Sequence, residues 1–171
     1  MSNSMKKNRP ENQVHTIRPV YDRDSRILIL GSFPSVRSRE TGFFYGHPRN
    51  RFWKVVSGLR KEPEPGTVPE KREFLLRNHI ALYDVIASCT ITGSSDSSIQ
   101  DAVPVDLTPL LAGTQIRQIF CNGGTSYRLY RKYLEEKTGK TAVRLPSTSP
   151  ANAACSLEKL LEEWSVCLDF L

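Results

Sequence analysis

The sequence predicts an α/β fold: a three-layer α/β/α sandwich around a central, mostly parallel four-stranded sheet. Three observations lead to this prediction. Four short apolar runs rich in β-branched residues are typical of strands buried on both faces. Segments with one apolar helical face separate these runs, as in parallel βαβ units. The chain has 171 residues and 39% hydrophobic content, which suffices for one domain with a full core.

The first strand and first helix follow directly from hydrophobic spacing. Arg26–Leu30, "RILIL", is an apolar run that ends at Gly31 and suits a buried strand. The next helix begins near Asn50, and its apolar residues recur at helical spacing. These residues are Phe52, Val55, Val56 and Leu59. The aromatic segment before this helix, "GFFYGHP", reads as an irregular loop.

A second helix and a second strand follow the turn-rich linker "RKEPEPGTVPE". Thr67 and Glu70 have the spacing of a capping box, which predicts a helix that runs to about Asn78. Ile80–Ile86, "IALYDVI", is the second expected strand. The Ser- and Gly-rich stretch "ASCTITGSSDSS" after it is predicted to be a loop.

The last two strand–helix pairs complete the alternation. Ile116–Asn122 is the third expected strand, and it breaks at Gly123-Gly124 into a helix that ends near Gly139. Thr141–Leu145 is the fourth strand. A final helix capped by Ser156 carries an apolar face. That face comprises Leu157, Leu160, Leu161, Trp164 and Leu168.

Charge and composition divide the chain into a tail and one domain. Residues 1–15 are polar and basic and are predicted to be a flexible basic tail, and residues 16–171 form a single expected domain. The net charge of +6 and the pI near 9.3 favour a polyanionic partner. Many ordinary domains are basic as well, so the charge alone leaves a simple solubility role open.

The cysteines and the apolar runs exclude several classes of protein. The four cysteines show no CxxC pair, which argues against a metal or iron–sulfur site and predicts small buried thiols. No apolar run has the length of a membrane span, and the first residues lack the apolar core of a signal peptide. We therefore expect no membrane partner and a cytoplasmic, nucleoid-associated protein.

The unusual residues gather on the loops after the expected strands, where open α/β sheets bind ligands. These loops contain no phosphate-binding GxxxxGK[ST] or GxGxxG motif, no GxSxG elbow and few converging carboxylates. They supply aromatic rings, amides, small hydroxyl residues and arginines instead. Such a set suits a flat heteroaromatic base taken out of a nucleic acid, because rings stack on the base and amides read its polar edge.

The segment "GFFYGHPRNRFWKVV" closely resembles the uracil-DNA glycosylase superfamily, from its base-stacking aromatic residue through HPxNRFW. The similarity is greatest to the hypoxanthine-DNA (deoxyinosine) glycosylase branch. It extends to "RILILGSFPS", "DVIASCTITGSSDSSI" and "LPSTSPANAACSLEKL", and so covers the chain from about Ile17 to the last helix. Mismatch-specific uracil glycosylases have G-x-N-P-G in the first motif, whereas this chain has Phe33 where their water-positioning Asn stands. The departure favours hypoxanthine over uracil.

The resemblance implies a role for each loop residue. Asn50, from HPxN, would be the catalytic residue that orients water, with a plain helix cap as the alternative role for its amide. The implied base-binding residues are Phe33, Tyr45, Asn122, Gly31 and Ser32. The implied DNA-binding residues are Ser35, His47, Arg49, Ser147, Thr148, Ser149, Pro150, Ala151 and Asn152. Three alternatives remain: Tyr45 as a core plug, His47 as a loop brace, and Asn122 as support for the Gly123-Gly124 turn. Asp84, Asp96 and Arg37 are supporting candidates.

The implied activity is hydrolysis of the N-glycosidic bond of a flipped deaminated base, most naturally hypoxanthine, in base excision repair. No lysine is placed as a Schiff-base nucleophile, so we expect a monofunctional DNA glycosylase without lyase activity, cofactor or metal. The expected partner is damaged double-stranded DNA, and the protein is expected to be a monomer with no obligate protein partner. The alternatives are a uracil or mismatch-specific glycosylase, a non-catalytic nucleic-acid-binding module, and a hydrolase of free nucleosides.

Overall fold

A computed structural model describes residues 9–171 of the chain, and its central sheet is the predicted one. Four parallel strands are ordered β3-β2-β6-β7. Their bounds are Ile27–Gly31 for β2, Ile80–Asp84 for β3, Gln118–Asn122 for β6 and Ala142–Leu145 for β7. All four predicted strands are therefore confirmed.

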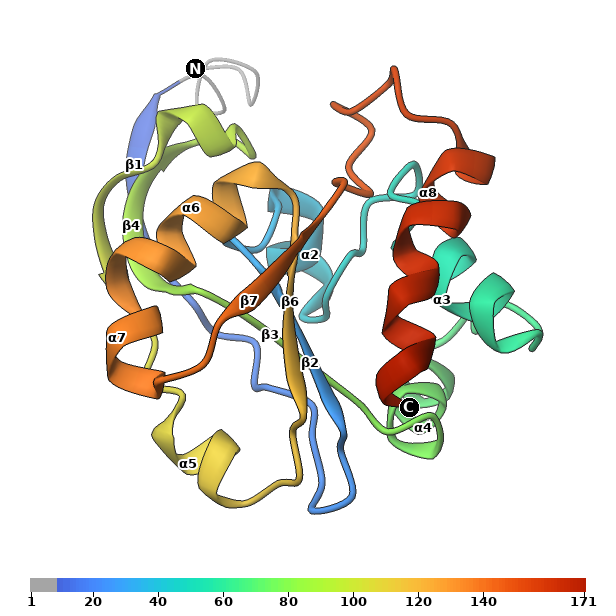
Figure 1. Cartoon of the computed structure of the whole chain (residues 1–171). Helices are drawn as coiled ribbons and strands as arrows, with labels where there is room; N and C mark the ends of the chain where they lie inside the picture. The colour runs from blue at the N-terminus through green and yellow to red at the C-terminus, as the bar shows by residue number, and fades with distance from the viewer. Residues whose placement is uncertain (1–8) are drawn as a thin grey trace.

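The central sheet is buried on both faces, because alternate residues of each strand point in opposite directions. Ile27 and Ile29 of β2 belong to one apolar cluster, and Leu28 and Leu30 belong to the other. Helices α3 (Phe52–Arg60), α4 (Val68–Arg77) and α8 (Leu157–Trp164) cover the first face. Helices α5 (Thr108–Ala112), α6 (Gly124–Tyr133) and α7 (Glu135–Thr138) lie on the other side of the sheet (Figure 1). The arrangement confirms the predicted three-layer α/β/α architecture.

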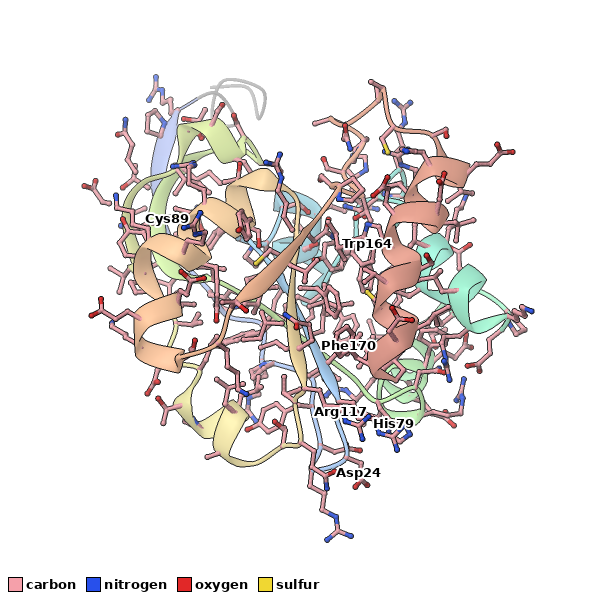
Figure 2. The ribbon with its side chains drawn as sticks, viewed as in Figure 1. Asp24, His79, Cys89, Arg117, Trp164 and Phe170 are labelled. Atoms are coloured by element: carbon pink, nitrogen blue, oxygen red, sulfur yellow. The ribbon has the colours of Figure 1, made fainter. Side chains whose placement is uncertain are left out.

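Helix α8 and the 3-10 turn η2 (Ser165–Phe170) seal the first layer through aromatic packing (Figure 2). The Trp164 ring is fully buried and meets the Phe52 ring of α3 edge-on at 6.0 Å. Phe170 meets Phe120 of β6 at 5.8 Å. Leu157 and Leu168, which were predicted to join this apolar face, are exposed instead. Leu168 lies beyond the regular helix, in η2, whereas Leu157 is the first residue of the helix.

A second, antiparallel sheet corrects two predictions. It has the order β1-β4-β5, with bounds Pro10–Val14, Ile86–Thr92 and Gln100–Pro104. The prediction of a flexible tail over residues 1–15 is wrong for residues 10–15, because β1 pairs with β4 along its whole length. Residues 1–8 of that tail lie outside the described residues. The stretch "ASCTITGSSDSS" is mainly strand β4 followed by a turn and the 3-10 turn η1 (Asp96–Ser98), not a loop.

A short helix interrupts the long segment between β2 and α3, which was expected to be irregular. Helix α2 covers Val36–Thr41 and begins at Ser35, whose Oγ accepts a hydrogen bond from the N–H of Ser38. It ends at Gly42 in the left-handed conformation. Residues 43–50, which carry the aromatic loop, run from this helix to α3 and remain irregular. Helix α2 thus sets where the aromatic loop begins.

Residues 9–171, the part of the chain that the structure describes, contain neither a membrane-spanning helix nor a metal-binding cluster. None of their helices is long and apolar enough to cross a membrane. No three side chains of His, Cys, Asp or Glu gather there in a way that could hold a metal ion. All four cysteines are free thiols; Cys155 is half-buried and the other three are buried.

Candidate active site

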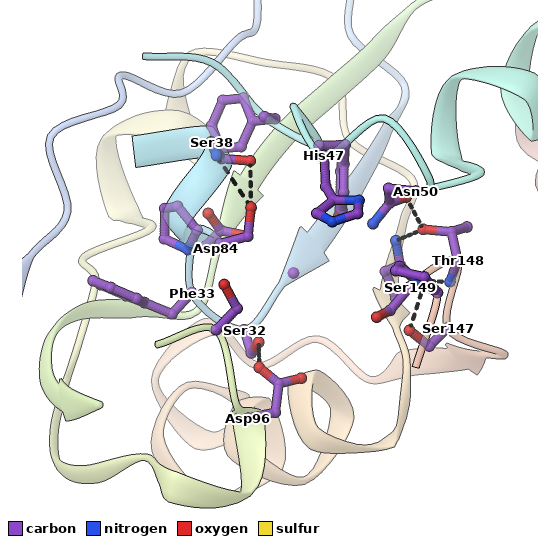
Figure 3. Close-up of a pocket in the computed structure, with 18 residues that line it drawn as sticks. Ser32, Phe33, Ser38, His47, Asn50, Asp84, Asp96, Ser147, Thr148 and Ser149 are labelled. Carbon is purple, nitrogen blue, oxygen red and sulfur yellow. Dashed lines mark hydrogen bonds between the residues drawn. The ribbon is translucent and has the colours of Figure 1, made fainter. Parts of the chain in front are cut away.

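A pocket of about 150 Å³ lies at the carboxyl ends of the central strands (Figure 3). In the sheet, β2 lies between β3, the next of the central strands along the chain, and β6. This is the switch point at which open α/β sheets bind ligands. The loop between α2 and α3, the turn after β4 and the loop after β7 complete the walls. The lining residues are Gly31, Ser32, Phe33, Pro34, Ser35, Ser38, Phe44, Tyr45, His47, Asn50, Asp84, Ser94, Asp96, Asn122, Ser147, Thr148, Ser149 and Pro150.

The structure brings most of the predicted site residues to this one pocket. Asn50 and all five predicted base-binding residues line it. Of the predicted DNA-binding residues, Arg49, Ala151 and Asn152 do not line it. Arg49 and Ala151 are exposed beside the pocket, and Asn152 is half-buried in the loop after β7. These three residues therefore lie outside the pocket, and the Nδ2 of Asn152 donates to the carbonyl of Ser147 at 3.0 Å.

Asn50 is held by its side-chain oxygen. The N–H of Phe52 donates to Asn50 Oδ1 at 2.9 Å, and the hydroxyl of Thr148 donates to the same oxygen at 2.8 Å. An amide oxygen has two lone pairs, so both are in use, and the backbone donor fixes which end of the amide is the oxygen. The Nδ2–H₂ group is therefore the part of Asn50 that can act on a ligand. Arg51 is the N-cap residue of α3, and Asn50, one residue earlier, accepts from the first helical N–H, that of Phe52. This structural role is compatible with presentation of a donor to the pocket.

Thr148 connects Asn50 to Asn122 across the pocket wall. Thr148 is fully buried, its N–H donates to Asn122 Oδ1 at 3.0 Å, and its Oγ1 accepts from Asn122 Nδ2 at 3.0 Å. The hydroxyl proton of Thr148 is thereby directed to Asn50. Asn122 does not support the Gly123-Gly124 turn with its amide; it orients Thr148, and one Nδ2 proton remains for another acceptor.

Tyr45 occupies a conformation that a bulky residue adopts rarely. Its φ is +52°, in the left-handed region, where a non-glycine residue costs of order 1–3 kcal/mol. The Tyr45 ring stacks on Phe52 at 4.2 Å with an interplanar angle of 21°. No group within residues 9–171 meets its buried hydroxyl in hydrogen-bonding geometry. Burial and the charge of Asp84 raise the pKa of this phenol, and the neighbouring Asn122 amide opposes the increase. Tyr45 is therefore braced from behind by Phe52 while its polar end is left unpaired beside the pocket.

The other aromatic residues of the loop divide between core and pocket. Phe43 is buried against Trp53 with centroids 6.1 Å apart, and it does not line the pocket. Phe44 is equally buried but contributes to the pocket wall, as does Phe33 after β2. Phe43 is thus a core residue, whereas Tyr45 both packs against the core and lines the pocket.

Asp84 ends β3 and places a buried carboxylate in the pocket wall. It pairs in register with Gly31 of the neighbouring strand. A Cβ at position 31 would lie 2.3 Å from Asp84 Oδ1 and 3.1 Å from the hydroxyl of Tyr45. A glycine is needed at position 31 because both groups approach the backbone there. The Nε2 of His15, just after β1, donates to Asp84 Oδ2 at 2.8 Å.

A second carboxylate belongs to Asp96 in the turn η1. Ser32 Oγ donates to Asp96 Oδ1 at 2.7 Å, which ties the end of β2 to this turn. Asp96 is exposed as a residue, but its carboxyl group points inward to Ser32. Loss of hydration raises the pKa of Asp96, the Ser32 hydrogen bond opposes this, and the nearby charge of Asp84 adds to the increase.

The loop after β7 is stabilised by its own hydroxyls and by Arg51. Ser147 Oγ accepts from the N–H of Ser149, and Ser149 Oγ accepts from the N–H of Ala151. The Arg51 guanidinium donates to the carbonyls of Ser149, at 3.3 Å, of Asn152, at 3.0 Å, and of Cys155. Two serine hydroxyls keep their O–H donors, and the loop is held as a preformed edge of the pocket.

His47 and Ser35 support the entrance through local hydrogen bonds. His47 Nδ1 accepts from the N–H of Arg49 at 3.0 Å, so one ring nitrogen braces the loop and Nε2 remains for a ligand. The Oγ of Ser35 caps α2 and donates a hydrogen bond to the Oγ of Ser38. The same Ser38 Oγ also accepts a hydrogen bond from the N–H of Gly46 at 3.0 Å. The predicted brace for His47 is present.

Sequence reasoning missed five contributors: Pro34, Ser38, Phe44 and Ser94, which line the pocket, and His15, which contacts Asp84. A short helix without hydrophobic periodicity conceals Ser38, and Ser94 belongs to the turn after a strand that was predicted to be a loop. Nothing in "PENQVHT" distinguishes His15, because its role depends on a strand pairing that brings residue 15 beside residue 84. The sequence did indicate Asp84, because it is an acidic residue at the end of an apolar strand.

Comparisons with known proteins show what this chain resembles. Residues 18–168 match the family model described as the uracil DNA glycosylase superfamily. A hypoxanthine DNA glycosylase from Methanosarcina acetivorans is 34% identical over 146 residues, which is 85% of this chain and 91% of the relative. One from Methanosarcina barkeri is 38% identical over 84 residues, 48% of this chain and 53% of that protein.

One solved structure shows the same fold. A solution NMR structure of a protein from Methanosarcina acetivorans, described as a candidate uracil DNA glycosylase, superposes with a TM-score of 0.78 at 32% identity. The match covers 91% of this chain and 96% of the other. Fold and sequence similarity therefore extend over nearly the whole chain, including every loop that builds the pocket.

Proposed function

This chain belongs to the uracil DNA glycosylase superfamily, and we propose that it is a monofunctional DNA glycosylase that removes hypoxanthine from deoxyinosine in DNA. The relatives named hypoxanthine DNA glycosylase support this substrate. The first motif points the same way, since Phe33 stands where the mismatch-specific uracil branch has its water-positioning amide. The reaction is hydrolysis of the N-glycosidic bond of a base flipped out of the duplex.

The observation that carries the proposal is the position of Asn50 in an aromatic-walled pocket, with only its amide donors available. The Nδ2–H₂ group of Asn50 donates to the attacking water and orients its oxygen toward the anomeric carbon of the sugar. The C–N bond breaks and the base leaves with the bonding electrons, while the proton that the water loses as the new C–O bond forms passes to solvent, from which the departing base takes up a proton. An amide is a weak base, so positioning supplies much of the rate.

Stabilisation of the departing base is the second requirement, because negative charge develops on it. Within residues 9–171 the backbone N–H groups of Ser32 and Phe33 meet no protein acceptor. The unpaired hydroxyl of Tyr45 and the remaining Nδ2 proton of Asn122 lie at the same pocket. These donors suit the oxygen and ring nitrogens of a departing purine.

The loop after β7 is the proposed contact to the DNA strand. Ser147 and Ser149 retain hydroxyl donors for phosphates, and the exposed Pro150 and Ala151 lie at the tip of the loop. Arg49 adds an exposed charge beside the pocket entrance. Such contacts position the duplex, while the pocket selects the base.

The test is a panel of duplexes that each contain one deoxyinosine, deoxyuridine, deoxyxanthosine or undamaged base. We expect free hypoxanthine and an intact strand with an abasic site that alkali then cleaves, in the presence of EDTA. A deoxyinosine duplex that survives excess enzyme would contradict the proposal. Preferential release of uracil would show that the alternative uracil activity is the principal one, and cleavage of free inosine but not DNA would indicate a nucleoside hydrolase.

A further inference from the structure

Helix α6 carries a row of cations that the proposed reaction does not use. Arg128, Arg131 and Lys132 are exposed and follow the i, i+3 and i+4 spacing of one helical face. The helix contains no acidic residue. Among the ion pairs of residues 9–171, Arg131 has one partner, Glu135 at 3.7 Å, whereas Arg128 and Lys132 have none. Two of the three cations are therefore available to an external anion.

The surface over these cations is hollowed. The open cleft there has a volume of about 380 Å³ and is lined by Tyr127, Arg128, Arg131, Lys132 and Glu135. The Arg131 guanidinium lies over the Tyr127 ring at 5.7 Å, and the Lys132 ammonium lies over the Tyr133 ring at 5.0 Å. A ring beneath a cation orders its side chain and leaves its N–H donors for another acceptor. The cleft thus presents ordered donors to an anionic group.

This surface continues the rim of the pocket. Gly123, just before α6, lies against the loop after β7, because a Cβ at position 123 would be 3.1 Å from the Cβ of Ser147. The Arg144 guanidinium, from β7, covers the first residue of α6, where an added Cβ would lie 2.8 Å from Nη2. Burial raises the pKa of the Asp96 carboxyl and the charge of Arg128 opposes the increase, so Arg128 lies near the turn that lines the pocket. The α6 basic face is defined as Arg128, Arg131, Lys132 and Arg144.

The length of α6 gives the distance of this face from the pocket. From the rim, the helix runs away from the loop after β7 (Figure 1). Residues 124 and 132 are eight positions apart, and an α-helix rises about 1.5 Å per residue, so the face extends about 12 Å from the rim. One strand of a duplex carries a phosphate every 3.4 Å or so along its axis. The face therefore spans roughly three to four phosphates, and Glu135 and Glu136 of α7 end it with negative charge.

We propose that the α6 basic face binds the phosphate backbone of the duplex that flanks the lesion, about three to five nucleotides from the flipped base. The partner rests on the function proposed above, whereas the surface is separate from the loops that hold the flipped nucleotide. A sugar-phosphate strand fits because its charges repeat along a line, as the cations do, and because arginine donates two hydrogen bonds to one phosphate. Phosphates are the same in every duplex, so the contact adds affinity without selecting a base.

Two double variants that each remove two positive charges test the proposal. Arg128→Gln with Lys132→Gln alters the α6 basic face. Arg23→Gln with Arg117→Gln is the matched control, because these exposed residues precede β2 and β6 and lie at the amino ends of the strands, away from the pocket (Figure 2). The probe is a duplex with one tetrahydrofuran abasic-site analogue, which fixes the register without a base. Affinity is measured by fluorescence anisotropy over a range of salt concentrations.

We expect the α6 double variant to lose about two units from the slope of log affinity against log salt, one for each phosphate contact. The control should keep the wild-type slope. Glu135→Gln removes the carboxylate that pairs with Arg131 and should raise the affinity for the duplex. A loss of stability could not produce that gain.

The position of the contact is measured with neutral methylphosphonate linkages, placed one at a time along the same duplex. Linkages about three to five nucleotides from the analogue, on one side, should weaken binding by the wild-type enzyme. The α6 double variant should show no further loss at these linkages, because its contacts there are already absent. Linkages next to the analogue should weaken both enzymes equally.

Several results would overturn the role of the α6 basic face. Equal changes of slope in the two double variants would show that net charge alone matters, and an unchanged slope in the α6 variant would leave this face to solvent or to an acidic protein. If the α6 variant does not fold, the methylphosphonate series with wild-type enzyme decides, since no effect beyond two nucleotides from the analogue would contradict the proposal. Failure to release hypoxanthine, with the expected slopes, would refute the proposed function and leave this DNA contact in place.

Discussion

Asn50 combines a structural and a chemical role in one amide, and the two can be separated by substitution. Asn50→Ala removes the acceptor for Phe52 and Thr148 as well as the pocket donor. We expect a loss of about 0.5–2 kcal/mol in the free energy of unfolding, as for a helix cap. Single-turnover excision should slow by at least roughly a hundredfold, as for removal of a catalytic hydrogen-bonding group.

Asn50→Asp is the matched control for that measurement. Its carboxylate keeps the acceptor for the N–H of Phe52 but presents no N–H to the pocket. We expect near-normal thermal stability together with slow excision, which melting curves and single-turnover kinetics would show. Near-normal excision by a folded Asn50→Ala enzyme would exclude Asn50 as the catalytic residue and direct attention to Asn122.

Thr148 carries the only protein hydroxyl that donates to Asn50 within the described residues. Thr148→Val keeps the shape but leaves the amide groups of Asn50 and Asn122 each without one partner. We expect about 1–3 kcal/mol of lost stability and excision slower by about tenfold, with lesion binding largely retained. Thr148→Ser restores the hydroxyl and should restore the rate. Equal rates for the Val and Ser variants would show that the hydroxyl does not orient Asn50.

Tyr45 offers a test of the unpaired hydroxyl. Tyr45→Phe removes a buried donor that costs about 1–3 kcal/mol when unsatisfied, so stability should stay equal or rise. Excision should nevertheless fall, because the hydroxyl is proposed to donate to the departing base. Tyr45→Ala should also lose stacking worth roughly 1–3 kcal/mol, seen as weaker lesion capture with little change in binding of undamaged duplex. Unchanged excision in both variants would remove Tyr45 from the site.

Residues of the pocket were predictable to the extent that they belong to local sequence motifs. Asn50 and Tyr45 lie in one continuous segment, so their proximity needs no knowledge of the fold. His15 and Asp84 are 69 positions apart, and their hydrogen bond depends on the pairing of β1 with β4. No local pattern signals such a contact.

At the scale of elements, the buried strands were predictable and the edge strands were not. Strand β2 is buried at every position, and its apolar run is unambiguous. Strands β1, "PENQV", and β5, "QDAVP", are mostly exposed and polar, so neither shows the alternation that marks a half-buried strand. Backbone pairing with β4 holds them in place instead. Helix α2 was missed for a related reason, since it has only six residues and no apolar stripe.

The loop after β7 depends on Arg51 for its shape, and this dependence can be tested. The planar guanidinium reaches three carbonyls of that loop, a geometry that the single ammonium of lysine cannot reproduce. Arg51→Lys keeps the charge, and we expect kcat/KM for deoxyinosine duplex to fall by about tenfold or more as the loop loosens. Arg49→Lys, at an exposed position, is the control and should have little effect. An unchanged kcat/KM in folded Arg51→Lys would show that the three carbonyl contacts of the guanidinium do not shape the site.

At the scale of the whole molecule, affinity and selectivity have different physical sources. The net charge of +6 and the exposed basic residues act on any duplex, because they neutralise phosphates and release counterions. The pocket acts only on a flipped base, through hydrogen bonds, stacking and the shape of its walls. The composition predicted the affinity for any duplex. The selectivity for a base depends instead on five loops that the fold brings together.

These two sources respond differently to salt, which provides the last prediction. The logarithm of the affinity for duplex should fall linearly with the logarithm of salt concentration, with a slope of about −0.9 per neutralised phosphate. Deoxyinosine and undamaged duplexes should lose affinity in parallel, because both make the same phosphate contacts. Their affinity ratio should therefore stay nearly constant between low and physiological salt, as measured by fluorescence anisotropy with a non-cleavable deoxyinosine analogue. Tyr45→Ala should lower that ratio without a change in slope, whereas removal of a phosphate-binding lysine or arginine should reduce the slope by about one unit and leave the ratio intact. Binding of deoxyinosine duplex that is insensitive to salt would show that the basic charge of this chain plays no part in DNA recognition.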